Sequence, residues 1–174
     1  MRAKKNSPTL ACALLKKDHL ETVIQKGVEL GVADFILFSS ERTVPQYESA
    51  DTPKKLERFQ KIADVAAKQS MFLGMPQIHA PILFHTLVAT FPDYSDVIFP
   101  WESESKQHFK TVFPNLKTSH LLILIGPEGG FTQTEAEFAQ TQGAHIVTLG
   151  DQILRSETAA LTAISLVQYE LGNL

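Results

Sequence analysis

The sequence has few of the features that mark specialised classes of protein. It contains a single cysteine, Cys12, which excludes a disulfide framework and favours a reducing cytoplasm. No apolar run approaches the roughly 18 residues that a membrane-spanning helix needs. The apolar stretch at 10–15 follows basic residues as in a signal peptide, but it ends in Lys16 and Lys17 with no cleavage site. We therefore expect a cytoplasmic protein that does not enter the membrane.

The chain also has no excess of positive charge. It carries 16 Lys and Arg against 19 Asp and Glu, a net charge of -3. RNA affinity depends largely on neutralising phosphates, so a strongly basic RNA-binding domain is excluded. Any RNA contact must come from a local patch, a second subunit or another chain. The six histidines show no metal-ligand spacing, and we expect no metal site.

The composition that remains is that of an ordinary globular domain. The 174 residues are 44% hydrophobic and 20% charged, which is enough apolar material for one substantial core. No internal repeat or low-complexity linker divides the chain. We expect a flexible tail at 1–8 and one domain at 9–174.

Short apolar segments alternate with amphipathic ones along the chain. This alternation predicts an α/β fold with a mostly parallel sheet and helices on both faces. The ligand of such a sheet lies beyond the carboxyl ends of its strands. The predicted strands lie at 9–15, 33–40, 77–82, 95–102, 120–126 and 145–150. The predicted helices lie at 19–31, 52–72, 84–90 and 155–172, with a further helix beginning after Thr132.

Helix ends are marked by capping residues. Thr132 with Glu135 three positions later has the spacing of a capping box. Asp18 and Ser156 are predicted to cap the first and last helices. Glycines at 31 and 172 are predicted to end them.

One predicted strand runs directly into the glycine-rich segment GPEGG at 126–130. The segment matches neither the dinucleotide fingerprint G-x-G-x-x-G nor the phosphate-binding loop G-x-x-x-x-G-K-[ST]. Pro127 lacks an amide hydrogen, which weakens a phosphate site further. Close backbone approach plus the Glu128 carboxylate suits an amine, a ribose or an adenine edge. The alternative is an ordinary strand-to-helix turn.

A second strand ends in the segment LGDQILRSETAAL at 149–161. Ile153 and Leu154 could form a wall for an adenine ring. Arg155 stands at a helix N-terminus, where the helix dipole favours anions. This placement indicates either a functional cation or an ion pair to Glu157 or Glu128.

Together, LIGPEGGFTQTEAEF and LGDQILRSETAAL resemble the paired motifs of the ribosomal small-subunit RNA uracil-N3 methyltransferases. These belong to the SPOUT class of trefoil-knotted methyltransferases. The N-terminal segments LLKKDHLETVIQKGVELGV, SSERTV, ERFQKIADVAAKQS and MPQI are similar to the family as well. The resemblance covers about residues 9–172.

The resemblance implies a fold, a cofactor and a substrate. The fold would be an α/β knot with a deep C-terminal trefoil knot, in which 149–172 threads through a loop of earlier chain. The protein would work as a homodimer, with its final helix at the two-fold axis. S-adenosylmethionine (SAM) would supply a methyl group for N3 of one uracil in 16S rRNA of the small ribosomal subunit. The implied cofactor-binding residues are Phe99, Pro100, Ile125, Gly126, Glu128, Gly129, Leu149, Gly150, Ile153, Leu154 and Arg155.

Methylation at N3 requires loss of a proton from the base and stabilisation of negative charge on its carbonyls. Arg155 is the candidate cation, because a guanidinium presents several donors to an anionic base. Glu128 and Glu157 are the candidate general bases, and the sequence does not choose between them. Three further positions carried over from the family, Lys26, Glu29 and Arg42, would bind the RNA substrate or support the residues of the site from behind.

Two departures from the family pattern favour a second hypothesis. Lys68 replaces a family glutamate, and Phe72 occupies the position of a family arginine. The N-terminal RNA-binding domain of PUA type that family members carry is expected to be missing. The alternative function is a catalytically weakened SAM-binding or ribosome-interaction module of the same fold. A third hypothesis is a nucleotide-binding α/β domain that prefers ATP or NAD to SAM.

Overall fold

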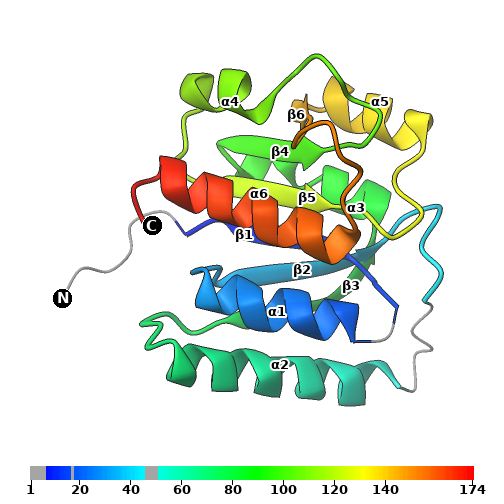
Figure 1. The fold of residues 1–174 in the computed structure, drawn as a ribbon. Coiled ribbons are helices and arrows are strands. Elements are labelled where there is room, and N and C mark those ends of the chain that lie inside the picture. Colours follow the sequence, from blue (N-terminus) through cyan, green and yellow to red (C-terminus); the bar gives the residue numbers. More distant parts are fainter. Residues whose placement is uncertain (1–6, 17, 46–50) are drawn as a thin grey trace.

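The structure, a computed structural model, describes residues 7–16, 18–45 and 51–174. Six strands form one sheet in the order β3-β2-β1-β5-β4-β6, and every neighbouring pair is parallel (Figure 1). The predicted mostly parallel sheet is therefore confirmed. The strands are β1 (Thr9–Ala13), β2 (Asp34–Ser39), β3 (Gln77–Leu83), β4 (Asp96–Pro100), β5 (Leu121–Ile125) and β6 (Ala144–Val147).

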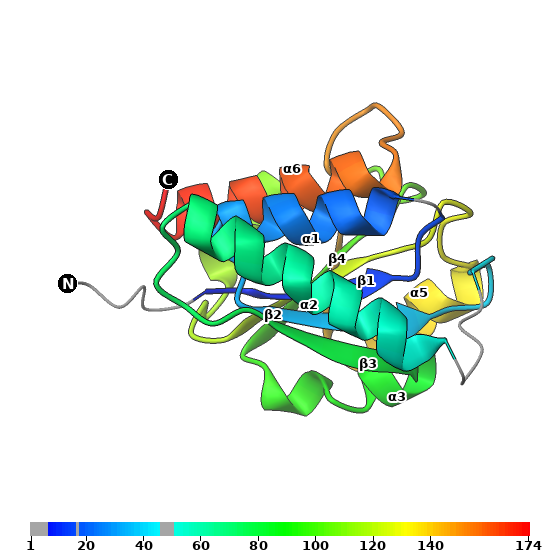
Figure 2. The ribbon, with the colours of Figure 1, turned by 90° about the horizontal axis from the view of Figure 1, so that it is seen from below.

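Helices cover both faces of this sheet, as predicted. Figure 2 shows α6, α1 and α2 on one side of the sheet and α3 on the other. Each side has its own cluster of buried apolar residues. The helices are α1 (His19–Glu29), α2 (Thr52–Gln69), α3 (Phe84–Val88), α4 (Phe109–Val112), α5 (Gln133–Thr141) and α6 (Ser156–Glu170). Within the described part of the chain, none of them has the length and apolar character of a membrane span.

The predicted elements agree with the structure to within a few residues at each end. The two 3-10 turns η1 (Phe91–Asp93) and η2 (Phe113–Asn115), like α4, were not predicted, because they are too short to show a helical period. Residues 1–6 of the predicted tail lie outside the described residues, and Pro8 is buried.

The capping predictions were right for one helix and wrong for two. Glu135 N–H donates to Thr132 Oγ1 at 3.2 Å and Thr132 N–H to Glu135 Oε2 at 2.9 Å, so the capping box is present. Asp18 occupies the N-cap of α1 but makes no side-chain cap bond, because its backbone is not in the extended region that aims a cap. Ser156 is already helical, and Arg155 takes the N-cap position of α6.

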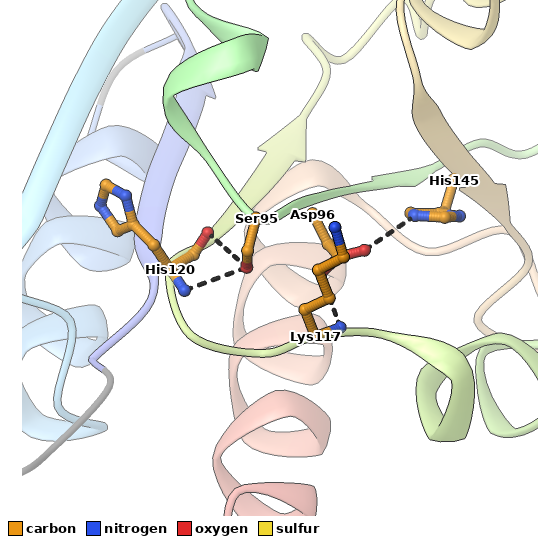
Figure 3. Close-up of polar contacts among 5 residues, drawn as sticks. All are labelled: Ser95, Asp96, Lys117, His120 and His145. Atoms are coloured by element: carbon orange, nitrogen blue, oxygen red, sulfur yellow. Dashed lines mark hydrogen bonds and ion pairs between the residues drawn. The ribbon is translucent and has the colours of Figure 1, made fainter.

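The amino-terminal edge of β4, β5 and β6 is held by side chains (Figure 3). Asp96 accepts a hydrogen bond from Lys117 N–H at 2.8 Å and lies 3.2 Å from His145 Nε2. Ser95 exchanges two hydrogen bonds with the backbone of His120, at 3.0 and 3.1 Å. These contacts hold the loop 116–120 against the starts of β4 and β6. The opposite, carboxyl edge of the sheet is the one where a ligand of this fold is expected.

Candidate functional site

A cavity of about 640 Å³ lies at the carboxyl edge of the sheet. Ligand sites usually measure about 300–1,000 Å³. Its walls come from the segments that follow β4, β5 and β6, and from the N-termini of α1 and α6. The lining residues are His19, 100–102, 125–131, 148–157 and Ala159.

The GPEGG segment forms a closed turn on one side of the cavity. Gly130 N–H donates to Pro127 O at 2.9 Å, and Gly130 has a φ of 67°. A Cβ at Gly130 would collide with the Glu102 carboxylate. Glu128 Oε1 accepts a hydrogen bond from Lys16 N–H at 2.7 Å, which ties the turn to the connection between β1 and α1. The turn is thus held in one shape, with its carboxylate on the cavity wall.

Aromatic residues support this turn from below. The ring of Phe131 lies 4.3 Å from that of Phe99, centroid to centroid, and Trp101 Nε1 donates to Phe131 O at 3.4 Å. Phe131 and Trp101 line the cavity, whereas Phe99 is fully buried and does not. The side chain of Phe99, a predicted cofactor-binding residue, therefore packs beneath Phe131 and does not face the cavity.

The segment after β6 forms the apolar side of the cavity. Gly150 N–H donates to Thr148 Oγ1 at 3.2 Å, and the same hydroxyl donates to Gly150 O at 3.0 Å. Gly150 has a φ of 133°, which only glycine adopts readily. Beyond this turn Ile153 is 84% exposed and lines the cavity together with Leu154. An exposed apolar side chain beside a cavity provides a surface for a flat, weakly polar ring.

Arg155 lines the cavity with an exposed side chain and makes no ion pair with any described residue. The predicted alternative of an ion pair to Glu157 or Glu128 is therefore not seen. These two carboxylates instead flank His19. Its Nδ1 lies 3.6 Å from Glu128 Oε1 and 3.7 Å from Glu157 Oε2.

His19 Nδ1 and Glu157 Oε2 are both buried atoms without a hydrogen-bond partner in the described structure. Sequence reasoning missed His19 because it searched the histidines only for metal-ligand spacing. Its only sequence signal was its place after the predicted strand 9–15. The pairing of this strand with β5, which brings His19 beside the GPEGG turn, is seen only in the structure.

The remaining predicted cofactor-binding residues are also found at the cavity. The structure brings Pro100, Ile125, Gly126, Gly129 and Leu149 to the cavity wall.

The three predicted substrate-binding residues lie outside that wall. Lys26 Nζ pairs with Glu29 Oε1 at 2.9 Å on the side of α1. Arg42 Nη1 donates to Gly129 O at 3.1 Å and so contacts the GPEGG turn from outside.

Cys12 lies at the end of β1, near this site. Full burial, with a smaller contribution from the charge of Glu128, raises the pKa of the Cys12 thiol far above its usual range. The thiol therefore stays protonated and behaves as a small apolar side chain.

Comparison with known proteins identifies the family. Residues 3–168 match the family described as RNA methyltransferase domain. The chain is 39% identical to ribosomal RNA small subunit methyltransferase E of Bacillus subtilis, over 92% of this chain and 65% of that protein. The protein of the same name from Mesomycoplasma hyopneumoniae is 38% identical, over 90% of this chain and 67% of its own length.

A solved structure of ribosomal RNA small subunit methyltransferase E from Neisseria gonorrhoeae, bound to S-adenosyl methionine, is 29% identical. It matches with a TM-score of 0.84 over 95% of this chain and 66% of that chain. The chain thus spans about two thirds of the length of these relatives. With the family match extending over nearly the whole sequence, the chain belongs to the RNA methyltransferase domain family.

Proposed function

We propose that this chain binds SAM in the cavity at the carboxyl edge of the sheet and methylates N3 of a uracil in 16S rRNA of the small ribosomal subunit. One observation carries the proposal. The two segments that resemble the family motifs, 126–130 and 149–155, follow different strands and both line one cavity. The names of the relatives support the ribosomal substrate, and the Neisseria structure supports the cofactor.

The residues present fit SAM. The cavity has an apolar side at Leu149, Ile153 and Leu154 for adenine, and carboxylates at Glu102 and Glu128 for cationic groups. When bound, SAM supplies an electrophilic methyl group on a positively charged sulfur.

Two buried polar atoms at this wall, His19 Nδ1 and Glu157 Oε2, lie 3.7 Å apart and have no hydrogen-bond partner in the described structure. Burying a polar atom without a hydrogen-bond partner costs free energy. Such atoms therefore mark a place where a bound ligand or an added proton can supply the missing hydrogen bond.

The chain's own residues would align the RNA base and manage its charge. Arg155 is exposed on the cavity wall and makes no ion pair with a carboxylate of the described residues. Its guanidinium can therefore donate to a uracil carbonyl oxygen as negative charge develops on that oxygen. Glu128 and Glu157, the candidate general bases, lie on the same wall, and either would take the proton from N3 directly or through a neighbouring group. Lys26, Glu29 and Arg42 lie outside the cavity wall, where we propose that they contact RNA.

We also propose the assembly that the family resemblance implies, a cytoplasmic homodimer in which the segment 149–172 is threaded as a trefoil knot. Leu161 and Leu166 of α6 are half-buried in the single chain and suit a helix that packs against a second copy.

The second candidate function is a SAM-binding or ribosome-interaction module with weak turnover. It is favoured by Phe72, whose side chain packs against the core where the family has an arginine. If that arginine serves the RNA substrate, no neighbouring residue of 70–76 replaces it, because this segment contains no Arg or Lys.

Calorimetric titration with SAM, S-adenosylhomocysteine and ATP tests the cofactor first. We expect micromolar binding of SAM and its product at one site per subunit and no binding of ATP. Methyl transfer to undermethylated small subunits, wild type against Arg155→Ala, then separates the two functions. Incorporation that Arg155→Ala reduces supports the enzyme. SAM binding without incorporation at any subunit concentration supports the module, and ATP binding in place of SAM overturns both.

A further inference from the structure

We propose that His19 is the proton acceptor for the RNA base, and that Glu128 and Glu157 orient its ring. This inference rests on the proposed methyltransferase function and assigns the base that the reaction needs. It arises from the one histidine on the cavity wall, which neither the family resemblance nor the sequence patterns had singled out.

The position of the ring carries the proposal. His19 begins α1, and its Nδ1 is buried between two carboxylates that arrive from different elements, the β5–α5 turn and the N-terminus of α6. The carboxylates lie at 3.6 and 3.7 Å, slightly beyond hydrogen-bond length, and such contacts shorten when a ligand closes a site. Two negative oxygens on one side of an imidazole favour the proton on that nitrogen.

The other side of the ring is left as an acceptor. The His19 side chain is 32% exposed although its Nδ1 is buried, so the exposure belongs to other atoms of the side chain, and Nε2 is not among the buried partnerless atoms. No described residue donates a hydrogen bond to Nε2. An imidazole with Nδ1 protonated and Nε2 free is a neutral base, and the adjacent carboxylates stabilise the cation that forms when it accepts a proton.

The two carboxylates are less suited to accept the proton themselves. Glu128 Oε1 already accepts the Lys16 N–H at 2.7 Å. Glu157 lies in the first turn of α6, where a negative charge interacts favourably with the helix dipole. Both carboxylates are thus already engaged, one by a backbone donor and the other by the helix N-terminus.

Charged and titratable groups from four elements face the ring or lie beside the residues that face it. Glu128 faces it from the β5–α5 turn and Glu157 from α6. Lys16 and Asp18 come from the connection that leads into α1, and the protonated Cys12 thiol lies at the end of β1. Arg155, next to Glu157, makes no ion pair with the described residues and leaves both carboxylates free to face His19.

The N3–H bond of the uracil breaks and its proton passes to His19 Nε2, which gives an imidazolium. The electron pair left on N3 forms the new bond to the methyl carbon. The bond between that carbon and sulfur breaks, its electron pair stays on sulfur, and the neutral thioether product leaves. The imidazolium then loses its proton to water.

The tautomer of His19 is tested without any cofactor or RNA. Nitrogen NMR of the full chain, with His19 assigned by comparison with His19→Gln, reports which ring nitrogen carries the proton. We expect the Nδ1–H tautomer in the neutral ring, and a shift toward the other tautomer in the double variant with Glu128→Gln and Glu157→Gln. A neutral ring protonated on Nε2 in the wild type would overturn the proposal.

The second test is the pH profile of methyl transfer. Wild-type kcat/KM should fall as the pH drops through the range in which imidazoles titrate. In His19→Gln we expect a loss of about 10²-fold at neutral pH and saturating SAM, the usual contribution of a positioned base. The acid limb of the profile should disappear as well. The control is His85→Gln, an exposed histidine of α3, which should match the wild type.

The outcomes separate this inference from the proposed function. A wild type that binds no SAM or transfers no methyl group fails the proposed function, while the NMR result still decides the orientation of His19. A wild type that methylates, with a His19→Gln variant that keeps both the rate and the acid limb, overturns the inference alone. If His19→Gln unfolds, His19→Asn provides the same comparison, and its folded state is checked by circular dichroism.

Discussion

Cys12 is a residue whose chemistry is changed by the fold. It is fully buried at the end of β1, and burial raises the pKa of its thiol. Because the thiolate is the reactive form, we expect a thiol reagent such as DTNB to label the native protein only through unfolding. The labelling rate, measured in buffer and in denaturant, checks this. Rapid labelling in buffer, without loss of structure, would contradict it.

The same raised pKa predicts the direction of a pH effect on stability. An unfolded cysteine titrates near pH 8.5. Above that pH the unfolded chain loses a proton that the folded chain keeps, so the free energy of unfolding should fall by up to about 1.4 kcal/mol per pH unit. Denaturant unfolding between pH 7 and 10 measures this slope. Cys12→Ala should have a smaller slope, and an equal slope in the two proteins would contradict the assignment.

Substitution of Gly130, compared with substitution of Gly143, distinguishes the effect of backbone strain from the effect of a role in the cavity. Ala at Gly130 needs a left-handed backbone and displaces the Glu102 carboxylate from the cavity wall. Gly143 also has a positive φ, 97°, but an added Cβ meets nothing within 4 Å. We expect Gly130→Ala and Gly143→Ala each to lower the free energy of unfolding by about 1 kcal/mol.

Only Gly130→Ala should weaken SAM binding, by several-fold in a calorimetric titration. If both glycine variants bind SAM equally, the Glu102 carboxylate has no part in the site. If neither is destabilised, the positive φ angles carry no strain.

At the residue scale, half of the residues that line the cavity were predicted as site residues, and its histidine was missed. Gly126, Glu128 and Ile153 could be placed there because they lie in segments that directly follow apolar strands. His19 could not, since it reaches the cavity only through the pairing of β1 with β5, which joins segments more than 100 residues apart. Local patterns do not specify such a pairing.

The contacts of Asp96 join three elements at the amino-terminal edge of the sheet. Its side chain is 9% exposed, accepts the Lys117 N–H and contacts His145 of β6. Asp96→Ala leaves a backbone donor without its partner, and we expect it to lower the free energy of unfolding by about 1–3 kcal/mol. Urea unfolding provides the measurement.

The matched control is the second histidine–aspartate pair of this sheet, between His79 of β3 and Asp34 of β2. Both side chains are about half exposed, at 55% and 49%. His79→Gln should change stability by less than about 0.5 kcal/mol, because exposed ion pairs contribute little. Equal losses in Asp96→Ala and His79→Gln would mean that burial does not distinguish the two pairs.

At the element scale, hydrophobic period and turn residues were sufficient to find the six strands and the long helices. The capping box at Thr132 was predicted because both of its bonds are local. The cap at Ser156 was wrong by one residue, since the extended backbone that defines an N-cap falls on Arg155. The short α4 is held by burial of Phe109 and Phe113, a tertiary effect that leaves no helical period.

At the scale of the whole molecule, the strand order β3-β2-β1-β5-β4-β6 explains why the cavity lies where it does. The chain adds β2 and then β3 on one side of β1. It then crosses to the other side of β1, where β5 lies between β1 and β4. The segments after β1 and β5 therefore meet at the carboxyl edge, next to those after β4 and β6. The periodicity of the sequence carries no information about this order.

Because the cavity joins segments from both halves of the sheet, a ligand there should stabilise the whole domain. A ligand that binds only the folded chain adds about 2.7 kcal/mol of stability at a concentration 100 times its Kd. For a chain of this size, that free energy corresponds to a rise in Tm of roughly 5–10 °C. We expect S-adenosylhomocysteine to produce this rise in calorimetric scans and ATP to produce none.

Hydrogen exchange should locate the same effect in the structure. With S-adenosylhomocysteine bound, amides of 126–131 and 148–157 should exchange more slowly, because these segments line the cavity. Amides at the amino-terminal edge, around Ser95 and His120, should gain no more protection than the global rise in stability supplies. If the amides of that edge were selectively protected and those of 126–131 and 148–157 were unchanged, the ligand would bind elsewhere. The cavity would then not be the binding site of the family's cofactor.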